Sequence, residues 1–599
     1  MNIEYEFEKL LKRVEKPARY TGGEVNEVQK DPGNCSLRFG FAFPDMYEIG
    51  MSYLGLQVLY SVLNERDGTY CERVFAPAPD MESLMRERGV PLFTLETKTP
   101  VRELDILGFT LQYELSYTNV LNMLSLAGIP VFAKDRGEGM PFVVGGGPCA
   151  FNPEPVAGIF DAFLIGDGEE AVVKLCGLYE SWKASGEGKA SFLEAACRTE
   201  GVYVPSFYEP CYLETGEIGG VKKLFDGAAD RVKKSVLWDL NSTVPPEKCI
   251  VPLIETVHDR AVVETFRGCT RGCRFCQAGM IYRPVRERSS DSIIGSAERQ
   301  LKATGHEELS LLSLSTSDHS EFEPLATRLM AMCKENNVSL SLPSLRLDSF
   351  SFKALGEIGG YKKSGLTFAP EAGTQRLRDV INKNITEESI FGSVSQAAEL
   401  GWGTVKLYFM VGLPTETYED LDGIAEIARR IMEACRKGRM KLTVSVSNFV
   451  PKAHTPFQWE AQDAYEDFVS KHDYLKEKLK IKGVSFSYHD SCMSVVEAAL
   501  ARGDRRVTAA LVNAWEKGCR FDAWSEHFNY SLWKEAFEEA GVSMGYYASR
   551  KRKYDEALPW DVIDCLVSKE YLITENEKSK SAETTEDCRQ GCRQCGINT

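Results

Sequence analysis

The chain has 599 residues, 43% hydrophobic and 26% charged, which is the composition of an ordinary globular protein of roughly three or four domains. Its net charge of −16 argues against non-specific binding of nucleic acid. No apolar run approaches the length of a membrane span, and residues 1–17 lack the apolar core of a signal peptide, so we expect a cytoplasmic protein without a membrane partner. Eighteen cysteines in such a chain predict metal binding or catalysis rather than disulfides.

Residues 1–180 alternate strand-like and helix-like segments, which predicts an α/β domain with a parallel sheet. Glycine-rich turns follow two of the expected strands, at Gly145, Gly146 and Gly147 and at Gly166, Asp167 and Gly168. Parallel sheets bind ligands at the carboxyl ends of their strands, although such a turn can also be no more than a tight connection. Residues 181–250 are expected to be a linker with a small β excursion.

A short cysteine motif lies at the centre of the chain, where residues 267–276 read RGCTRGCRFC. It places Cys269, Cys273 and Cys276 at CxxxCxxC spacing, directly after a β-branched apolar run that predicts a strand. Three thiolates there can hold an iron–sulfur cluster with one open iron, or most of a zinc site. A zinc knuckle usually has a fourth ligand nearby, and His258 and His306 do not have zinc-finger spacing, which favours the cluster.

Strand-then-helix units repeat from about residue 250, which predicts a partial barrel of six strands rather than the eight of a complete TIM barrel. The expected strands are 261–266, 308–315, 338–349, 364–373, 404–414 and 441–451. Residues 461–575 are expected to be mainly helical, and residues 576–599 a flexible tail. The tail repeats the CxxxCxxC spacing at Cys588, Cys592 and Cys595, which leaves open a second metal site, a relay thiol, or unliganded thiols.

The central motif resembles the signature of radical SAM enzymes, with Phe275 directly before its last cysteine. The order VVGGGP, NPEPVAG, DAFLIGDGEE resembles the cobalamin-binding domain that precedes many radical SAM cores. This resemblance implies a [4Fe–4S] cluster on Cys269, Cys273 and Cys276, S-adenosylmethionine, cobalamin at the glycine-rich turns, and a low-potential electron donor of the flavodoxin or ferredoxin type. The first 257 residues contain no histidine, so this domain cannot supply one to cobalt. That fits either the sub-group without a lower histidine ligand or a vestigial domain.

The same resemblance assigns residues to the S-adenosylmethionine site. They are Phe275, Ser315, Thr316, Ser317, Asp318, Glu371, Arg376, Met410 and Gly412. Two of them have simpler interpretations, because Arg376 can form a surface ion pair and Glu371 can be a charge at the start of a helix. Residues 448–459 resemble the closing segment of proteins related to methylthiotransferases, but Cys35, Cys71 and Cys149 do not match the extra-cluster motifs of those enzymes.

The resulting expectation is a Rossmann-like cobalamin-binding-type domain, a (β/α)6 TIM-type radical SAM barrel and a helical extension. Their expected ranges are 1–180, 251–460 and 461–575, respectively. The implied function is reductive cleavage of S-adenosylmethionine to a 5′-deoxyadenosyl radical, coupled to cobalamin-dependent methyl transfer or rearrangement on an unknown substrate. The alternatives are a cobalamin-independent radical enzyme that modifies tRNA or a ribosomal component, and a non-catalytic metal- or RNA-binding scaffold.

Overall fold

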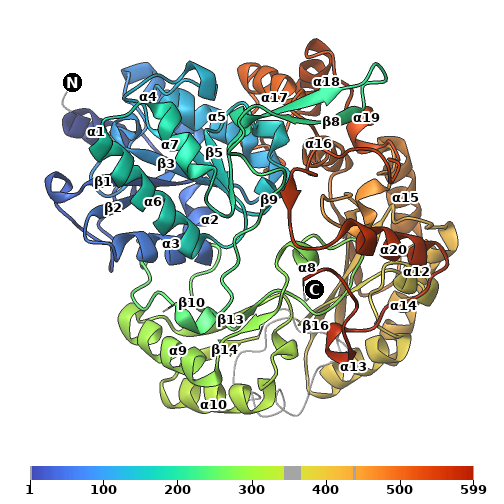
Figure 1. The fold of residues 1–599 in the computed structure, drawn as a ribbon. Coiled ribbons are helices and arrows are strands. Elements are labelled where there is room, and N and C mark those ends of the chain that lie inside the picture. Colours follow the sequence, from blue (N-terminus) through green and yellow to red (C-terminus); the bar gives the residue numbers. More distant parts are fainter. Residues whose placement is uncertain (1–2, 244, 343–365, 436–439, 598–599) are drawn as a thin grey trace.

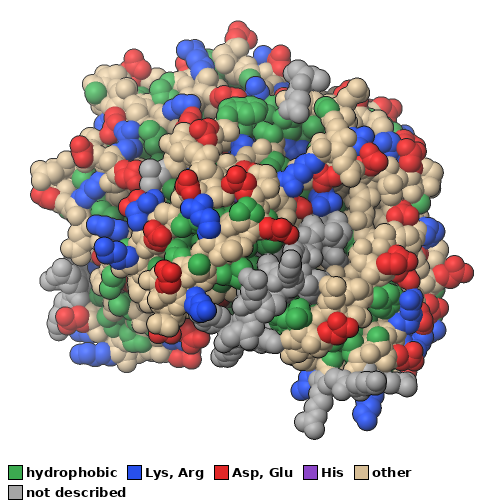
Figure 2. All heavy atoms as spheres, turned by 90° about the horizontal axis from the view of Figure 1, so that it is seen from below, with side chains coloured by type: hydrophobic (Ala, Val, Ile, Leu, Met, Phe, Trp, Pro, Cys, Tyr) green, Lys and Arg blue, Asp and Glu red, His purple; other side chains and the backbone are tan. Residues whose placement is uncertain are grey.

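The computed structural model describes residues 3–243, 245–342, 366–435 and 440–597. Figure 1 shows an N-terminal α/β domain at the upper left, the barrel strands below and to the right of it, and the C-terminal helices at the upper right. None of the helices in these ranges is long and apolar enough to cross a membrane. On the face seen in Figure 2, the described acidic and basic side chains are interspersed rather than gathered by sign.

The N-terminal domain is built on one sheet with the strand order β2-β1-β3-β4-β5-β6. Its strands are β1 Leu37–Phe43, β2 Thr69–Phe75, β3 Ile106–Thr110, β4 Phe142–Gly146, β5 Ala162–Leu164 and β6 Val202–Tyr203. The first five pair in parallel and β6 pairs antiparallel with β5, which confirms the expected parallel α/β sheet. Because β6 joins this sheet, the domain extends beyond residue 180, into the segment predicted to be a linker.

Helices cover both faces of this sheet. They are α1 Ile3–Leu11, α2 Tyr47–Met51, α3 Leu54–Asn64, α4 Pro79–Arg88, α5 Tyr117–Leu126, α6 Gly168–Ser185 and α7 Lys189–Ala196. Alternate residues of β3 enter two different hydrophobic cores, Leu107 and Phe109 on one face and Ile106 on the other. This is the period-two alternation of a sheet that is buried on both faces.

Residues 208–243 contain the predicted β excursion as an antiparallel hairpin of β7 Tyr208–Tyr212 and β8 Ile218–Lys223. The next strand, β9 Val232–Lys233, pairs with β19 Ile563–Asp564 close to the C-terminus. This segment therefore connects the N-terminal domain with the end of the chain.

The barrel region consists of two groups of parallel strands. They are β10 Ala261–Glu264, β13 Glu308–Leu312 and β14 Ser339–Ser341, and then β15 Leu366–Glu371, β16 Thr404–Val411, β17 Lys441–Asn448 and β18 Val484–Tyr488. Strands are present at all six predicted places, although the predicted residues 343–349 and 364–365 lie outside the described ranges. A seventh strand, β18, lies within the range 461–575 that is predicted to be mainly helical, and it extends the sheet beside β17.

Within the described residues, two short strands and seven helices surround these sheets. They are β11 Phe266–Arg267, β12 Arg286–Glu287, α8 Ala278–Ile281, α9 Ser290–Thr304, α10 Phe322–Glu335, α12 Gln375–Val380, α13 Glu387–Glu399, α14 Tyr418–Ala434 and α15 Tyr465–Lys478. The strands β11, which leads into the cysteine motif, and β12, which follows α8, pair antiparallel.

The C-terminal extension is mainly helical, as predicted, and shares a hydrophobic core with the N-terminal domain. Its helices are α16 Ser491–Ala501, α17 Val507–Glu516, α18 Tyr530–Glu539, α19 Met544–Ala548 and α20 Lys569–Lys580. The range 576–599, predicted to be a flexible tail, begins inside helix α20, which continues to Lys580. Asn576 of this helix is fully buried despite its polarity and donates to the carbonyl oxygen of Pro456 at 2.9 Å.

Candidate active site

The cysteine motif begins at the carboxyl end of a barrel strand. Strand β10 leads through β11 to Arg267, and Gly268 then turns the chain with a φ of +92°. A Cβ atom at Gly268 would lie 2.5 Å from the carbonyl oxygen of Pro284, so only glycine fits both this conformation and this close approach. The predicted position of the motif at a strand end is therefore found in the structure.

The three thiols of the motif influence one another electrostatically. Burial raises the pKa of Cys276 to about 12, and the neighbouring Cys273 and Cys269 add to this effect. Among the described residues, no group of three or more His, Cys, Asp or Glu side chains converges as the ligands of one metal ion would. A four-iron cluster does not need such convergence, because each cysteine binds a different iron.

Three of the residues assigned to S-adenosylmethionine lie together beside the motif. Phe275 packs against the hydrophobic cluster that contains Met410. The ammonium of Lys383 lies 3.1 Å from a carboxylate oxygen of Glu371 and 6.0 Å from the centre of the Phe275 ring. An apolar surface and a charged pair are thus side by side next to Cys276.

The segment after β13, which holds four of the residues assigned to S-adenosylmethionine, reaches the motif. Asp318 pairs with Arg271 of the cysteine loop at 2.9 Å. Thr316 is buried, and Ser313 donates to its hydroxyl at 3.2 Å; Ser317 lies between Thr316 and Asp318 in a short 3-10 turn. Ser315 is 3% exposed and its hydroxyl has no hydrogen-bond partner in the described structure. A buried hydroxyl without a partner is the kind of group that a bound polar ligand satisfies.

Two other assigned residues have structural roles that account for them. Arg376 is 45% exposed at its side chain and binds Thr415 and Asp420, so it forms the surface ion pair that was its simpler interpretation. Gly412 has a φ of +81°, and a Cβ atom there would lie 2.6 Å from the ring of Phe468. Packing against α15 therefore requires glycine at this position without any ligand.

A cavity of about 660 Å³ separates the N-terminal sheet from the first barrel strands. Both predicted glycine-rich turns line it, with residues 262–268 and 310–314 of the barrel on the other side. At Gly147, φ is +97° and ψ is −178°, and a Cβ atom would lie 2.8 Å from the carbonyl oxygen of Leu111. Non-glycine residues hardly ever adopt this conformation. At Gly147 the backbone therefore faces the cavity without a side chain.

Arg267 connects the cavity to the cysteine motif. Its guanidinium pairs with Asp167 at 2.8 Å, Glu169 at 2.8 Å and Glu264 at 3.0 Å. Although burial alone would raise the pKa of Asp167, Arg267 and Arg286 lower it, so this carboxylate stays charged. Asp167, predicted to bind a cofactor, thus serves as a link between the N-terminal domain and the barrel.

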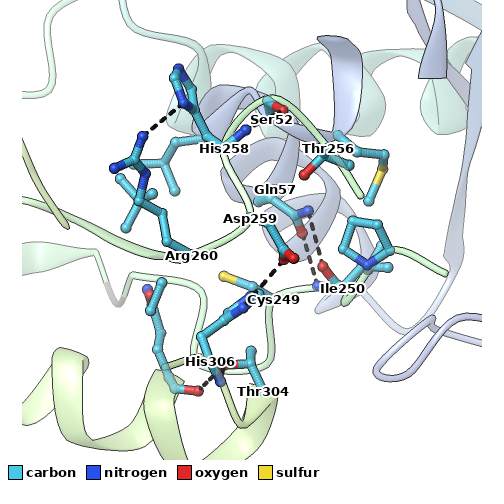
Figure 3. A pocket seen from close by; sticks show the side chains of 16 residues that line it. Ser52, Gln57, Cys249, Ile250, Thr256, His258, Asp259, Arg260, Thr304 and His306 are labelled. Atoms are coloured by element: carbon cyan, nitrogen blue, oxygen red, sulfur yellow. Dashed lines mark hydrogen bonds and ion pairs between the residues drawn. The ribbon is translucent and has the colours of Figure 1, made fainter. Parts of the chain in front are cut away.

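The two histidines considered as zinc ligands line a smaller pocket of about 40 Å³, shown in Figure 3. His306 lies 3.6 Å from Asp259, and His258 lies 2.9 Å from Arg260. Burial lowers the pKa of both histidines, which keeps them neutral at pH 7. His258 also lines the large cavity, from the segment before β10. The sequence did not predict that His258 lines this cavity, because only the residues of the N-terminal domain were considered as a source of a histidine ligand for cobalt.

The second cysteine motif lies directly on the first. The backbone N–H of Cys588 donates to the carbonyl oxygen of Thr270 at 3.2 Å. Asp587 accepts from the hydroxyl of Thr270 at 2.9 Å and pairs with Arg271 at 2.9 Å. The repeated spacing was visible in the sequence, but nothing in the sequence indicated that the two motifs meet.

Two family models match the chain. Residues 55–205 match radical SAM proteins, N-terminal, and residues 263–428 match the radical SAM superfamily. The chain is 28% identical over 506 residues to an uncharacterized protein of Methanocaldococcus jannaschii, covering 82% of this chain and 97% of that protein. It is 22% identical over 203 residues to the ribosomal protein uS12 methylthiotransferase RimO of Thermoanaerobacter, covering 33% of this chain and 46% of that one.

Two solved structures resemble the fold at low identity. The radical S-adenosylmethionine methyltransferase TsrM from Kitasatospora setae, with cobalamin and a [4Fe–4S] cluster bound, has 14% identity and a TM-score of 0.47, covering 68% of this chain and 74% of TsrM. The cobalamin-dependent S-adenosylmethionine radical enzyme OxsB, with aqua-cobalamin bound, has 13% identity and a TM-score of 0.45, covering 85% of this chain and 72% of OxsB.

Proposed function

We propose that this chain, which carries both radical SAM domains, is a radical SAM enzyme that uses cobalamin to transfer a methyl group to an unactivated carbon or phosphorus centre. The observation that carries the proposal is the cavity of about 660 Å³ that joins the glycine-rich sheet edge to the cysteine motif. A bound [4Fe–4S] cluster supplies one electron that cleaves S-adenosylmethionine, and bound cobalamin supplies a transferable methyl group.

The residues at the motif fit a cluster and S-adenosylmethionine. Cys269, Cys273 and Cys276 would each hold one iron and leave the fourth open to the cosubstrate. Ser315 offers a buried hydroxyl without a partner to a polar group of the ligand. Phe275, together with the apolar cluster around it, offers a surface against which a purine can pack and from which water is excluded.

The cavity fits a large cofactor. Its volume lies in the range of about 300–1,000 Å³ that is usual for ligand and cofactor sites. Apolar and aromatic side chains such as Phe39, Phe41 and Val144 line one wall, and the glycine-rich turns line the sheet edge together with polar residues such as Thr110 and Gln112. The barrel wall ends at Gly268, next to Cys269, so a ligand in the cavity would extend to the cluster loop.

The first test is anaerobic reconstitution of the full chain with iron, sulfide and hydroxocobalamin, followed by desalting and metal counts. We expect about one cobalt per chain beside iron, and formation of 5′-deoxyadenosine with S-adenosylmethionine and dithionite. Cys276→Ala should abolish 5′-deoxyadenosine, whereas Cys211→Ala, which removes an exposed thiol on the β7–β8 hairpin, should not.

The outcomes separate the competing functions. Iron and 5′-deoxyadenosine without cobalt would favour a cobalamin-independent radical enzyme whose cavity holds substrate. Cobalt with turnover but no methylated product would favour a rearrangement. Zinc at the central motif and no 5′-deoxyadenosine would leave only a metal-binding scaffold.

A further inference from the structure

The C-terminal tail is held against the cysteine loop at several points along its length. Before the second motif, the N–H of Thr585 donates to Asn382 at 2.8 Å, and Asn382 in turn donates to the carbonyl oxygen of Gly272 at 3.1 Å. After it, the N–H of Ser568 donates to the carbonyl oxygen of Cys595 at 2.8 Å. Both ends of the motif are therefore fixed to ordered parts of the protein.

Side chains of the second motif also bind the S-adenosylmethionine region. Arg589 donates to the carbonyl oxygen of Asp318 and pairs with Glu287 at 3.0 Å. Asp587 pairs with Arg271, which also holds Asp318. The charges on both sides of Cys588 thus lock its loop onto the loop that carries Cys269 and Cys273.

A buried cation, Arg283, lies against the first motif. Arg283 is 3% exposed, and its guanidinium donates to the carbonyl oxygen of Arg271 at 3.0 Å. One of its terminal nitrogens, Nη1, is buried without a hydrogen-bond partner in the described structure. Its guanidinium also lies 5.5 Å from the ring centre of Tyr571, a residue of helix α20, which leads to the second motif. A buried arginine is stable when negative charge lies opposite it, and metal-bound thiolates provide such charge.

We propose that Cys588, Cys592 and Cys595 bind a second iron–sulfur cluster, which passes electrons to the cluster on the central motif. This inference rests on the proposed radical SAM function. One electron at a time passes from a reduced flavodoxin or ferredoxin to the second cluster and then to the first, and no bond is made or broken in the transfer. Cys592 is exposed, so a donor protein can approach the second cluster from solvent.

Two other uses of these thiols fit the structure less well. A structural zinc site needs four ligands, whereas the second motif supplies three cysteines. None of the three cysteines takes part in a disulfide. Their spacing equals that of the central motif, and the same spacing suits the same kind of cluster.

The test compares the full-length wild type with two triple variants after anaerobic reconstitution with iron and sulfide. One replaces Cys588, Cys592 and Cys595 by alanine, and the other replaces Cys269, Cys273 and Cys276. We expect about eight irons and eight sulfides per wild-type chain and about four of each in either variant. Cys211→Ala serves as the control for loss of an exposed thiol and should keep the wild-type count.

Mössbauer and EPR spectra of the wild type provide a measurement that does not depend on folding of the variants. Two clusters should be present, and S-adenosylmethionine should change the spectrum of only one. About four irons in the wild type, unchanged in the tail variant, would overturn the proposal, as would one zinc per chain that the tail variant loses.

The relay is tested by the source of electrons. With reduced flavodoxin, the tail variant should form 5′-deoxyadenosine at least tenfold more slowly than wild type, while dithionite, a small reductant, should drive both within about threefold of each other. Equal losses with both reductants would overturn the relay. Eight irons without any 5′-deoxyadenosine would instead refute the radical SAM function and leave the second cluster in place.

Discussion

Removing the guanidinium of Arg267 should loosen the contact between the N-terminal domain and the barrel. In Arg267→Met, the carboxylates of Asp167, Glu169 and Glu264 lose a shared partner. The exposed fraction of their side chains is between 6% and 18%, so water replaces the guanidinium poorly. Removing one partner of a buried ion pair typically destabilises a protein by about 3–5 kcal/mol, because it leaves charge buried without compensation.

The control is Arg430→Met, which removes an exposed pair with Glu387 at 2.9 Å. The two side chains of that pair are 46% and 39% exposed, so we expect a loss of about 0–1 kcal/mol. Arg267→Lys should recover part of the loss, since it restores the charge but not the two-pronged contact with three carboxylates.

Urea unfolding of the apoprotein measures the free-energy differences, and hydrogen exchange locates them. Faster exchange should appear in α6, which begins beside Asp167, and in β11, and not in the β7–β8 hairpin. If the unfolding free energies of Arg267→Met and Arg430→Met agree within about 0.5 kcal/mol, Arg267 is not the buried link described above.

Three further predictions concern the cavity, a buried histidine and the tail. Gly147→Ala should lower cobalt retention and destabilise the protein by about 2–3 kcal/mol, because its Cβ would meet Leu111. The control is Gly139→Ala, where φ is +83° and nothing lies within 4 Å of the new Cβ. It should destabilise the protein by about 1 kcal/mol and retain cobalt. Burial lowers the pKa of His454 to about 4, so the unfolded chain takes up a proton below pH 6.5 before the folded one does. Between pH 6.5 and pH 5, urea unfolding should therefore show a loss of stability about 2 kcal/mol larger in wild type than in His454→Gln. Asp587→Asn should weaken the contact of the tail with Arg271 and speed proteolysis of the last residues severalfold, whereas Asp230→Asn, at an exposed pair, should not.

Local patterns in the sequence were sufficient to predict the position of the central motif and the six barrel strands. The run before Cys269 is β-branched and apolar, so strand propensity and burial agree there. Strand β2 lacks such a pattern, because it contains two adjacent charged residues, Glu72 and Arg73. Arg73 is fully buried and pairs with Glu24 and Glu96 at 2.9 and 2.6 Å, partners that no local pattern reveals.

The candidate site was predictable only where its residues follow strands. The segment from Ser315 to Asp318 reaches the cysteine loop because carboxyl ends of parallel strands meet at one edge. Arg376 follows a strand as well, but its guanidinium forms an ion pair with Asp420 at the start of α14. Contact between the two cysteine motifs could not be predicted, since Thr270 and Asp587 are 317 residues apart and their hydrogen bond leaves no local signature.

The three arginines of residues 267–276 hold this short loop against the N-terminal domain, the barrel and the C-terminal part of the chain. Arg267 binds carboxylates of the N-terminal domain, and Arg271 binds Asp318 of the barrel and Asp587 of the tail. Arg274, fully buried, binds Glu575 of α20 at 3.1 Å. Cations between the cysteines would also offset the negative charge of metal-bound thiolates. The sequence that supplies the proposed cluster ligands thus also supplies the contacts that hold the surrounding domains against them, and displacement of any one domain would disturb the position of the cysteines.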